Sequence, residues 1–367
     1  MVPERSVRRV LMSGDTVGGV WTYSLDLARE LTGRGITVTL ATMGPAPSSD
    51  QRREASQISG LRVNHRDLAL EWMDHPWDDV ARAGDWLLEL AARERPDVVH
   101  LGSYAHGALE LGAPVVVVGH SCVLSWWEAV KHEPAPPAWA RYQDAVQRGI
   151  AGADKVVAPT RAMLAALHRH YGPLAQDRCQ VIANGRRRFG GPVTGGKQPV
   201  IFAAGRLWDE AKNLALLDAI APRLKWPVRI AGEPCAPSGR SLSIHAAVAL
   251  GHLSAAEMAQ EYARASIYVL PARYEPFGLS ALEAALAGCA LVLGDIASLR
   301  EVWDEAAAFV PPDDPGELAH TLGQLIRDDR RRTVLAASAQ RRARDLTPAR
   351  TATAYLDLYQ RLVAGDR

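Results

Sequence analysis

Two glutamates flank a short turn in the segment RYEPFGLSALEAALAG, which spans residues 273–288. The apolar run SIYVLPA precedes it, so this region reads as a strand, a proline-containing loop and a helix whose first turn lies around Gly278 to Glu283. The first N–H groups of a helix lack intrahelical partners and the helix dipole is positive at this end. The turn therefore favours an anion, and Gly278 has no Cβ that would obstruct one.

Each glutamate also has an interpretation that needs no ligand. The spacing Ser280-x-x-Glu283 fits a capping box, in which the two side chains satisfy backbone N–H groups at the start of a helix. Glu275, in the loop, would then be an ordinary solvated carboxylate.

Two further turns follow predicted strands and carry residues suited to a phosphate. The segment GDTVGGVW follows the first strand and brings Gly18 and Gly19 to the start of a helix, although it is not a G-x-G-x-x-G fingerprint and a plain tight turn fits equally well. The segment AAGRLWDEAKN places Arg206 and Lys212 near another helix start, where two solvated surface cations are the alternative.

Short apolar runs alternate with amphipathic stretches along the whole chain, which is the pattern of βαβ units around parallel sheets. Six runs in each half are strand candidates, and the Gly/Pro-rich segment FGGPVTGGKQ interrupts the series. We predict an α/β protein with two Rossmann-like doubly wound domains, residues 1–190 and 191–345, facing across a cleft at their strand carboxyl ends. Residues 346–367 are expected to form a C-terminal helix that packs back on the first domain.

Composition narrows the class of protein. The chain has 367 residues, 48% of them apolar, which is enough for two cores, and its formal net charge of +1 provides no global field for nucleic acid. Four cysteines without C-x-x-C spacing indicate neither a zinc site nor a disulfide framework. The longest apolar run, near APVVVVG, is too short to span a bilayer. We expect a soluble cytoplasmic protein, and the sequence leaves contact with a membrane surface open.

The motif EPFGLSALEA resembles the E-x7-E signature of the GT-B retaining glycosyltransferases of the family 4 type. Other segments follow the order of that family: VGGVW early, VVVGHS after a strand, VIANG closing the first domain and AGRLWDEAKN opening the second. The resemblance covers nearly the whole chain and implies the GT-B fold, a nucleotide-sugar donor and a small-molecule or glycan acceptor.

The resemblance also implies roles for the second-domain residues. Arg206 and Lys212 would neutralise the donor diphosphate, which matters most as the leaving group gains negative charge. The backbone at Gly278, Leu279 and Ser280 would hold a phosphate. Glu275 would accept hydrogen bonds from donor-sugar hydroxyls, and Glu283 from the ribose diol.

In the first domain, the same resemblance places His120 beside the C6 hydroxyl of the sugar and the reacting centre, and it lets the Gly18 and Gly19 loop approach the donor. Trp126 and Trp127 follow closely and could pack on an acceptor, although buried core tryptophans are the alternative.

The implied chemistry needs neither an acid/base pair nor a cofactor. In a glycosidase two carboxyl groups must flank one scissile bond, whereas here the glutamates would bind opposite ends of the diphosphate. Retaining enzymes of this family are thought to use same-face attack, in which the leaving phosphate takes the acceptor's proton. No D-x-D triplet occurs, so a metal-independent site is expected.

One departure and two alternatives remain. The family commonly has Lys-Gly after the diphosphate arginine, whereas Asn213 follows Lys212 here, which puts the loop conformation in doubt. A nucleotide-sugar epimerase on the same fold would consume the donor without an acceptor. A non-catalytic nucleotide-sugar-binding protein would bind the donor without turnover.

Overall fold

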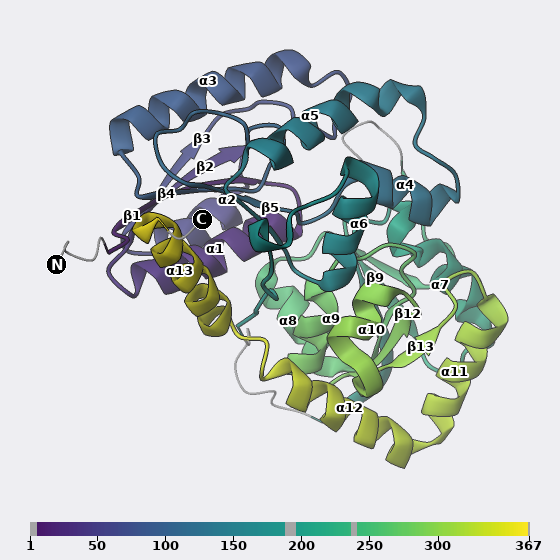
Figure 1. Ribbon diagram of the computed structural model, residues 1–367. Helices are drawn as coiled ribbons and strands as arrows, with labels where there is room; N and C mark the ends of the chain where they lie inside the picture. The colour runs from purple at the N-terminus through teal and green to yellow at the C-terminus, as the bar shows by residue number, and fades with distance from the viewer. Residues whose placement is uncertain (1–5, 188–195, 236–240, 366–367) are drawn as a thin grey trace. The chain divides into compact units, whose positions relative to one another are not determined.

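The computed structural model describes residues 6–187, 196–235 and 241–365, and the chain divides into two compact units (Figure 1). The first unit comprises the chain up to Glu128, Glu133–Gly185 and the chain from Pro348 onwards. The second comprises Ala129–His132 and Arg186–Thr347. The boundary predicted between residues 190 and 191 lies outside the described residues.

The first unit is built on a seven-stranded parallel sheet with the order β3-β2-β1-β4-β5-β6-β7. Its strands are β1 (Arg9–Asp15), β2 (Thr37–Met43), β3 (Leu61–His65), β4 (Val98–Leu101), β5 (Val115–Val118), β6 (Lys155–Ala158) and β7 (Cys179–Val181). The sequence analysis missed β3, an edge strand with partly or fully exposed residues throughout, because such a strand contains no continuous apolar run.

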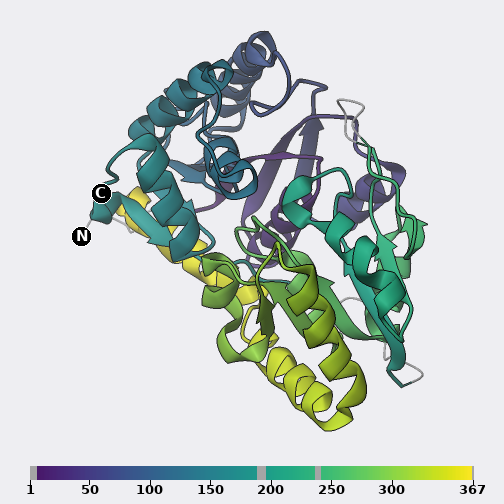
Figure 2. The same cartoon turned by 90° about the vertical axis from the view of Figure 1, so that its right-hand side faces the viewer.

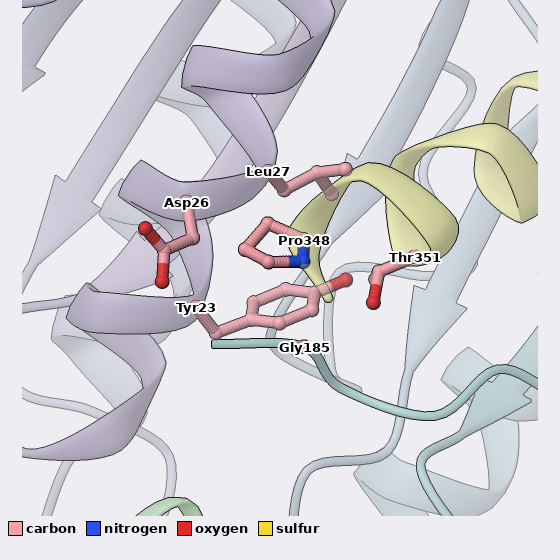
Figure 3. A pocket seen from close by; sticks show the side chains of 6 residues that line it. All are labelled: Tyr23, Asp26, Leu27, Gly185, Pro348 and Thr351. Carbon is pink, nitrogen blue, oxygen red and sulfur yellow. The ribbon is translucent and has the colours of Figure 1, made fainter. Parts of the chain in front are cut away.

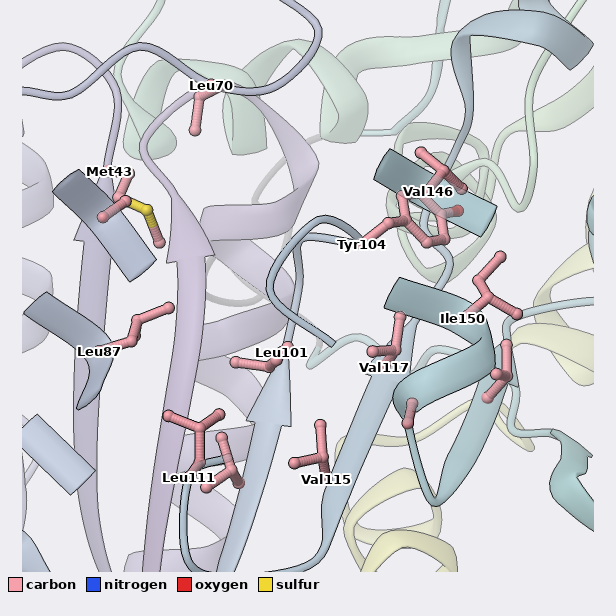
Figure 4. Close-up of a cluster of buried hydrophobic side chains, with 14 of the residues drawn as sticks. Met43, Leu70, Leu87, Leu101, Tyr104, Leu111, Val115, Val117, Val146 and Ile150 are labelled. Carbon is pink, nitrogen blue, oxygen red and sulfur yellow. The ribbon is translucent and has the colours of Figure 1, made fainter. Parts of the chain in front are cut away.

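Helices cover both faces of this sheet. The helices of this unit are α1 (Gly19–Thr32), α2 (Ser49–Ser56), α3 (Trp77–Glu94), α5 (Ala140–Gly152), α6 (Arg161–Tyr171), α13 (Pro348–Ala364) and the part of α4 (Val123–Lys131) up to Glu128, with 3-10 turns at Pro137–Trp139 and Gln176–Arg178. Successive strand residues enter opposite cores, as Leu11 and Met12 do. Figure 4 shows the core cluster that Val115 and Val117 of β5 share with Leu87 of α3 and Val146 of α5.

The opposite face of the first sheet is covered by α1 together with the C-terminal helix α13, which lie side by side in Figure 1. Tyr355, Leu358 and Tyr359 of α13 are fully buried in the same apolar cluster as Leu27 and Leu31 of α1. The last helix of the chain is therefore part of the core of the first unit.

The second unit contains a six-stranded parallel sheet with the order β10-β9-β8-β11-β12-β13. Its strands are β8 (Gln198–Ala204), β9 (Val228–Ala231), β10 (Val248–Gly251), β11 (Ala265–Leu270), β12 (Ala290–Gly294) and β13 (Ala308–Val310). Its helices are α7 (Leu214–Ile220), α8 (Ala255–Arg264), α9 (Leu279–Leu286), α10 (Ala297–Trp303), α11 (Pro315–Arg327) and α12 (Asp329–Ala343), with 3-10 turns at Glu210–Lys212, Ala221–Arg223 and Asp304–Ala306.

Two apolar clusters fill the faces of this second sheet. Phe202 of β8 packs with Leu282 of α9 and Ala339 of α12, whereas the neighbouring Ile201 packs with Leu217 of α7 and Leu318 of α11. Figure 2 shows α11 and α12 beside one another in yellow-green. Both units are thus doubly wound α/β sheets, as the alternation of apolar runs predicted. No helix in the described part of the chain is long and apolar enough to cross a membrane.

Candidate functional site

Helix α9 begins at the turn where the sequence predicted an anion site. Gly278 is its N-cap residue, with φ of 89° and ψ of 60°, a left-handed conformation that favours glycine over residues with a Cβ. A Cβ on Gly278 would also lie 3.1 Å from Cδ2 of Leu299. The N–H groups of Leu279 and Ser280 have no acceptor among the described residues, so they are available to a ligand.

The capping-box alternative is wrong because the helix starts at Leu279, which places Ser280 inside the first turn. Gly278 is the N-cap residue and has no side chain with which to cap the helix. Neither Ser280 nor Glu283 therefore stands at its position in the Ser-x-x-Glu pattern.

Glu275 is largely buried and is held by three hydrogen-bond donors. Its Oε2 accepts a hydrogen bond from Nζ of Lys212 at 2.7 Å, and its Oε1 accepts from the N–H groups of Gly278 at 2.9 Å and Phe277 at 3.4 Å. Burial opposes ionisation, but Lys212 and the two N–H donors outweigh it, and the pKa of Glu275 lies below its usual value. This carboxylate is not a solvated loop residue, since its side chain is only 14% exposed.

The turn after β8 supplies the two predicted cations. Lys212 is 16% exposed and faces Glu275, so it is not a solvated lysine. Arg206 donates from Nη2 to Oδ2 of Asp209 at 2.7 Å and lies over the ring of Trp208. Nε of Arg206 is buried and has no hydrogen-bond partner within the described ranges. One polar atom of this arginine is thus unsatisfied.

Asn213 accounts for the departure from the Lys-Gly pattern. It has φ of 55° and ψ of 33°, the left-handed conformation that glycine adopts easily and that asparagine tolerates better than most residues. Its Nδ2 also donates to the carbonyl oxygens of Pro271 at 3.2 Å and Pro312 at 2.6 Å. Asparagine therefore preserves a glycine-like backbone and ties the Lys212 turn to two neighbouring loops.

Glu283 on α9 forms a nearly buried ion pair that the sequence did not predict. Nε of Arg186 donates to Oε1 of Glu283 at 2.7 Å, and the two side chains are 11% and 12% exposed. The partners are 97 residues apart, so no local spacing could have revealed the pair. The structure thus links the predicted ribose ligand to an arginine that follows the VIANG segment.

In the first unit, β1 leads through a tight turn into α1. Oδ1 of Asp15 accepts from the N–H of Val17 at 2.8 Å, Gly18 is the N-cap residue with φ of 79°, and Gly19 is the first helical residue. Residues that have a Cβ rarely adopt this φ, so the backbone conformation itself favours glycine at position 18. The approach of the Gly18 and Gly19 loop to a donor stays a prediction.

His120 follows β5 at the carboxyl edge of the first sheet. Its Nε2 is buried without a hydrogen-bond partner in the described part of the chain. Its ring meets that of Tyr23 edge to face, with centroids 4.6 Å apart. Burial lowers the pKa of His120 to about 4, so the imidazole is neutral near pH 7 and can accept or donate one hydrogen bond at each nitrogen without titrating.

Trp126 and Trp127 lie on α4, both half-buried, with ring centroids 5.8 Å apart. Nε1 of Trp127 is buried without a partner among the residues described. The alternative interpretation, two buried core tryptophans, requires both rings to be fully buried, and neither is. Packing of these rings on an acceptor stays a prediction.

Glu71, which the sequence analysis did not single out, is a buried carboxylate near the same edge of the first sheet. It accepts from the N–H groups of Tyr104 at 3.0 Å and Ala105 at 2.8 Å. Burial raises the pKa of Glu71 to about 7 against these two donors, and the carboxylate of Asp15 raises it further. The hydroxyl of Tyr104 donates to the carbonyl oxygen of Ser121, next to His120, at 2.9 Å. Glu71 thus fixes a loop that supports the His120 turn.

The second unit therefore gathers two cations, one carboxylate and an open helix N-terminus on the loops that follow β8 and β11. The N–H of Arg273 donates to the carbonyl oxygen of Ala211 at 2.9 Å and joins these two loops directly. Such a set can neutralise a diphosphate and at the same time accept hydrogen bonds from hydroxyl groups.

Comparisons with known proteins match this chain along most of its length. Residues 17–186 match the model of Glycosyltransferase Family 4, and residues 198–328 match that of Glycosyl transferases group 1. A D-inositol 3-phosphate glycosyltransferase of Xylanimonas cellulosilytica is 29% identical over 95% of this chain and 92% of its own. A glycogen synthase of Mycobacterium tuberculosis is 29% identical, over 89% and 85% respectively.

Solved structures share the fold. Sucrose-phosphate synthase from Thermosynechococcus elongatus superimposes with a TM-score of 0.77 and 17% identity, covering 98% of this chain and all of its own. Anabaena HepE in complex with UDP-glucose gives a TM-score of 0.75 and 17% identity, covering 95% and 98%. These two likenesses concern the fold alone.

Proposed function

Because the chain belongs to the family 4 type of glycosyltransferases (glycosyl transferases group 1) and has the GT-B fold, we propose that it transfers a sugar from a nucleotide-diphosphate sugar to a small-molecule or glycan acceptor. In this proposal the anomeric configuration is retained and neither a metal nor another cofactor takes part. The observation that carries it is the largely buried ion pair of Lys212 and Glu275 beside the open N-terminus of α9.

The donor diphosphate would lie against Lys212, Arg206 and the N–H groups of Leu279 and Ser280. The ammonium group of Lys212 has three donor hydrogens, and Glu275 takes one of them. The unsatisfied Nε of Arg206 offers a further donor. Positive charge fixed in place before the reaction stabilises the leaving diphosphate more than the bound donor, because negative charge grows on it as the bond breaks.

Glu275 would hold the donor sugar. A carboxylate has about four lone-pair positions, and three donors already use three of them, namely Lys212, Gly278 and Phe277. One position remains for a sugar hydroxyl. Because its pKa is lowered, Glu275 stays ionised as a hydrogen-bond acceptor and is unsuited to act as a general acid.

His120 would bind a sugar hydroxyl as a neutral imidazole. A pKa of about 4 makes it a poor general base near pH 7, since an imidazole with so low a pKa binds a proton only weakly at that pH. The acceptor proton would instead go to the leaving phosphate, with attack on the same face of the sugar, and no protein nucleophile is needed.

The relatives suggest which substrates to test first. Two of them are named for an inositol phosphate and for glycogen, and one solved structure contains UDP-glucose. We accordingly propose UDP-glucose as the first donor, with a phosphorylated polyol and a glucan as the first acceptors.

A thermal-shift panel of UDP-, GDP-, ADP- and TDP-sugars tests donor binding, because a ligand that binds only the folded state raises the melting temperature. The donor that binds is then incubated with each acceptor in EDTA, and the product anomer is identified by NMR. The proposal predicts turnover in EDTA and a product with the donor's configuration. A strict need for Mg²⁺ or Mn²⁺ contradicts metal independence, and inversion contradicts retention.

The same experiment separates the alternatives. Conversion of the donor to another sugar nucleotide without an acceptor would indicate an epimerase. Binding of the donor with neither transfer nor conversion, across the acceptor panel, would indicate a non-catalytic binding protein.

A further inference from the structure

A chain of hydrogen-bonded aromatic side chains runs through the core of the first unit and ends beside His120. The hydroxyl of Tyr23 on α1 is bonded to Nε2 of His100 on β4 at 3.2 Å. Nδ1 of His100 is bonded to the hydroxyl of Tyr359 on α13 at 2.6 Å. All three side chains are at least 96% buried, so this is a satisfied polar network inside an apolar core.

Tyr23 joins this network to His120. Its ring meets the His120 ring edge to face at 4.6 Å, while its hydroxyl is fixed by His100. Figure 3 shows the Tyr23 ring beside Pro348 and Thr351 at the start of α13, with the backbone of Gly185 on its other side. The hollow lined by these residues encloses essentially no volume, ≈ 0 Å³. Tyr23 therefore has little space in which to change its rotamer.

His120, by contrast, is not oriented by a hydrogen bond of its own. No side-chain hydrogen bond joins it to any residue in the described ranges, and Nε2 is buried and unsatisfied. Its backbone N–H reaches the carbonyl oxygen of Val118 at 3.2 Å, which holds the main chain but not the ring. The orientation of the imidazole depends on packing, and the edge-to-face contact with Tyr23 is the ring contact that it makes in the described chain.

We propose that Tyr23 is a positioning residue for His120, and that the C-terminal helix fixes Tyr23 through Tyr359 and His100. This inference rests on the proposed function, since it gives His120 the task of meeting the donor sugar. It assigns to α13, more than two hundred residues away in sequence, a part in aligning that imidazole.

The network has the chemistry that this role requires. A neutral imidazole carries one N–H and one lone pair, so His100 can accept from one tyrosine and donate to the other at the same time. Burial and the neighbouring His120 lower the pKa of His100 to about 3, which keeps it neutral across the physiological range. The titratable groups that face His120 are Tyr23 and His100, and neither is charged near pH 7.

Two substitutions on the same helix separate positioning from stability. Tyr359→Phe removes the hydroxyl that anchors His100. Tyr355→Phe is the matched control, because Tyr355 is equally buried on α13, and its ring likewise meets the His100 ring edge to face. Its hydroxyl, however, does not bond His100; it lies beside the hydroxyl of Tyr23, which His100 continues to hold in this variant. Each change deletes one buried oxygen from one tyrosine.

The first readout is the histidine NMR spectrum of the full-length protein, with the His120 resonance assigned by its absence in His120→Gln. In the wild type this resonance should not titrate between about pH 7.5 and pH 5.5, because the buried ring has a pKa well below that window. In Tyr23→Leu and Tyr359→Phe the loosened ring gains hydration, and we expect it to begin titrating there. In Tyr355→Phe it should stay as in the wild type.

The second readout is turnover of UDP-glucose below the melting temperature of every variant. Tyr359→Phe should lower kcat about tenfold or more, as misplacement of a group near the reacting centre does, with KM for UDP-glucose nearly unchanged. The same change in a His120→Ala background should have no further effect.

The outcomes distinguish this inference from the proposed function. If the His120 resonance does not change between about pH 7.5 and pH 5.5 in Tyr23→Leu and Tyr359→Phe, as in the wild type, then the proposed positioning role of Tyr23 is wrong, whatever the kinetics. If the resonance responds but His120→Ala leaves turnover unchanged, or the wild type turns over no nucleotide sugar, the positioning contact stands and the proposed role of His120 fails.

Discussion

The ion pair between Lys212 and Glu275 should contribute both to stability and to catalysis, and the two contributions can be separated. Lys212→Met keeps the length of the side chain but leaves the carboxylate of Glu275 without its cation. Removing one partner of a buried ion pair costs roughly 3–5 kcal/mol in proteins. The Gly278 and Phe277 N–H groups remain as donors, so we expect the lower end, about 3 kcal/mol.

The cost should depend on pH in a defined direction. In the wild type the pKa of Glu275 is lowered, so its stabilising contribution is present above the unfolded value of about 4.5 and is lost as pH falls through the folded value. In Lys212→Met burial dominates and the pKa is raised. The free energy of unfolding lost by the variant should therefore be larger near pH 7 than near pH 5.

The double variant Lys212→Met/Glu275→Gln distinguishes the two contributions. It contains no charge at this position, so most of the stability should return, whereas kcat should stay lowered on the order of 10²-fold or more because the diphosphate has lost a fixed charge and the donor sugar has lost the Glu275 carboxylate. Arg229→Met is the matched control. Arg229 forms a comparable ion pair with Glu261 in the same unit at 2.7 Å, on β9 and α8.

Stability is measured by denaturant unfolding, and turnover with UDP-glucose is measured below every melting transition. Arg229→Met should lose stability, less than Lys212→Met because Arg264 also binds Glu261, and should keep turnover within about twofold. Recovery of turnover together with stability in the double variant would refute a catalytic role for Lys212.

Three further outcomes are expected. His120→Ala should lower kcat sharply and leave donor affinity nearly intact, because the second unit supplies most of the proposed donor contacts; a parallel loss of affinity and melting temperature would make it a structural residue. The raised pKa of Glu71 stabilises the fold below about pH 4.5, and this contribution is lost as pH rises through about 7. Relative to Glu71→Gln, wild-type unfolding free energy should fall by up to about 3 kcal/mol over that range, and a constant difference would contradict the titration. Asn213→Ala should destabilise more than Asn213→Gly, by about 1 kcal/mol, because alanine resists the left-handed conformation; equal losses would leave only the side-chain hydrogen bonds as the cause.

Local patterns predicted much of the fold and part of the site. The alternation of apolar runs indicated two doubly wound sheets because buried parallel strands are apolar on both faces. Strand β3 was not predicted, because it lies at a sheet edge and contains no continuous apolar run. Helix α9 starts at Leu279 because Gly278 adopts a left-handed conformation. The Ser280-x-x-Glu283 spacing instead offered Ser280 as the N-cap residue.

The partners of the charged residues could not be predicted, because they are determined by tertiary structure. Lys212 and Glu275 are 63 residues apart, and Arg186 and Glu283 are 97 residues apart. The sequence named three of these four residues, but only the fold pairs them. The network from Tyr23 to Tyr359 likewise could not be predicted from local sequence patterns, since its members come from the first and last helices and a central strand.

The central claim is that the two glutamates hold opposite ends of one donor, and calorimetric titration tests it most directly. Wild type, Glu275→Gln and Glu283→Ala are each titrated with UDP and with UDP-glucose, or with the diphosphate and sugar of whichever nucleotide the thermal-shift panel selects. Glu283→Ala should lower the affinity for both UDP and UDP-glucose, since both contain ribose. Glu275→Gln should lower the affinity for UDP-glucose alone, since UDP has no sugar at this position. Unchanged UDP affinity in Glu283→Ala, or equal losses for both ligands in Glu275→Gln, would contradict the account.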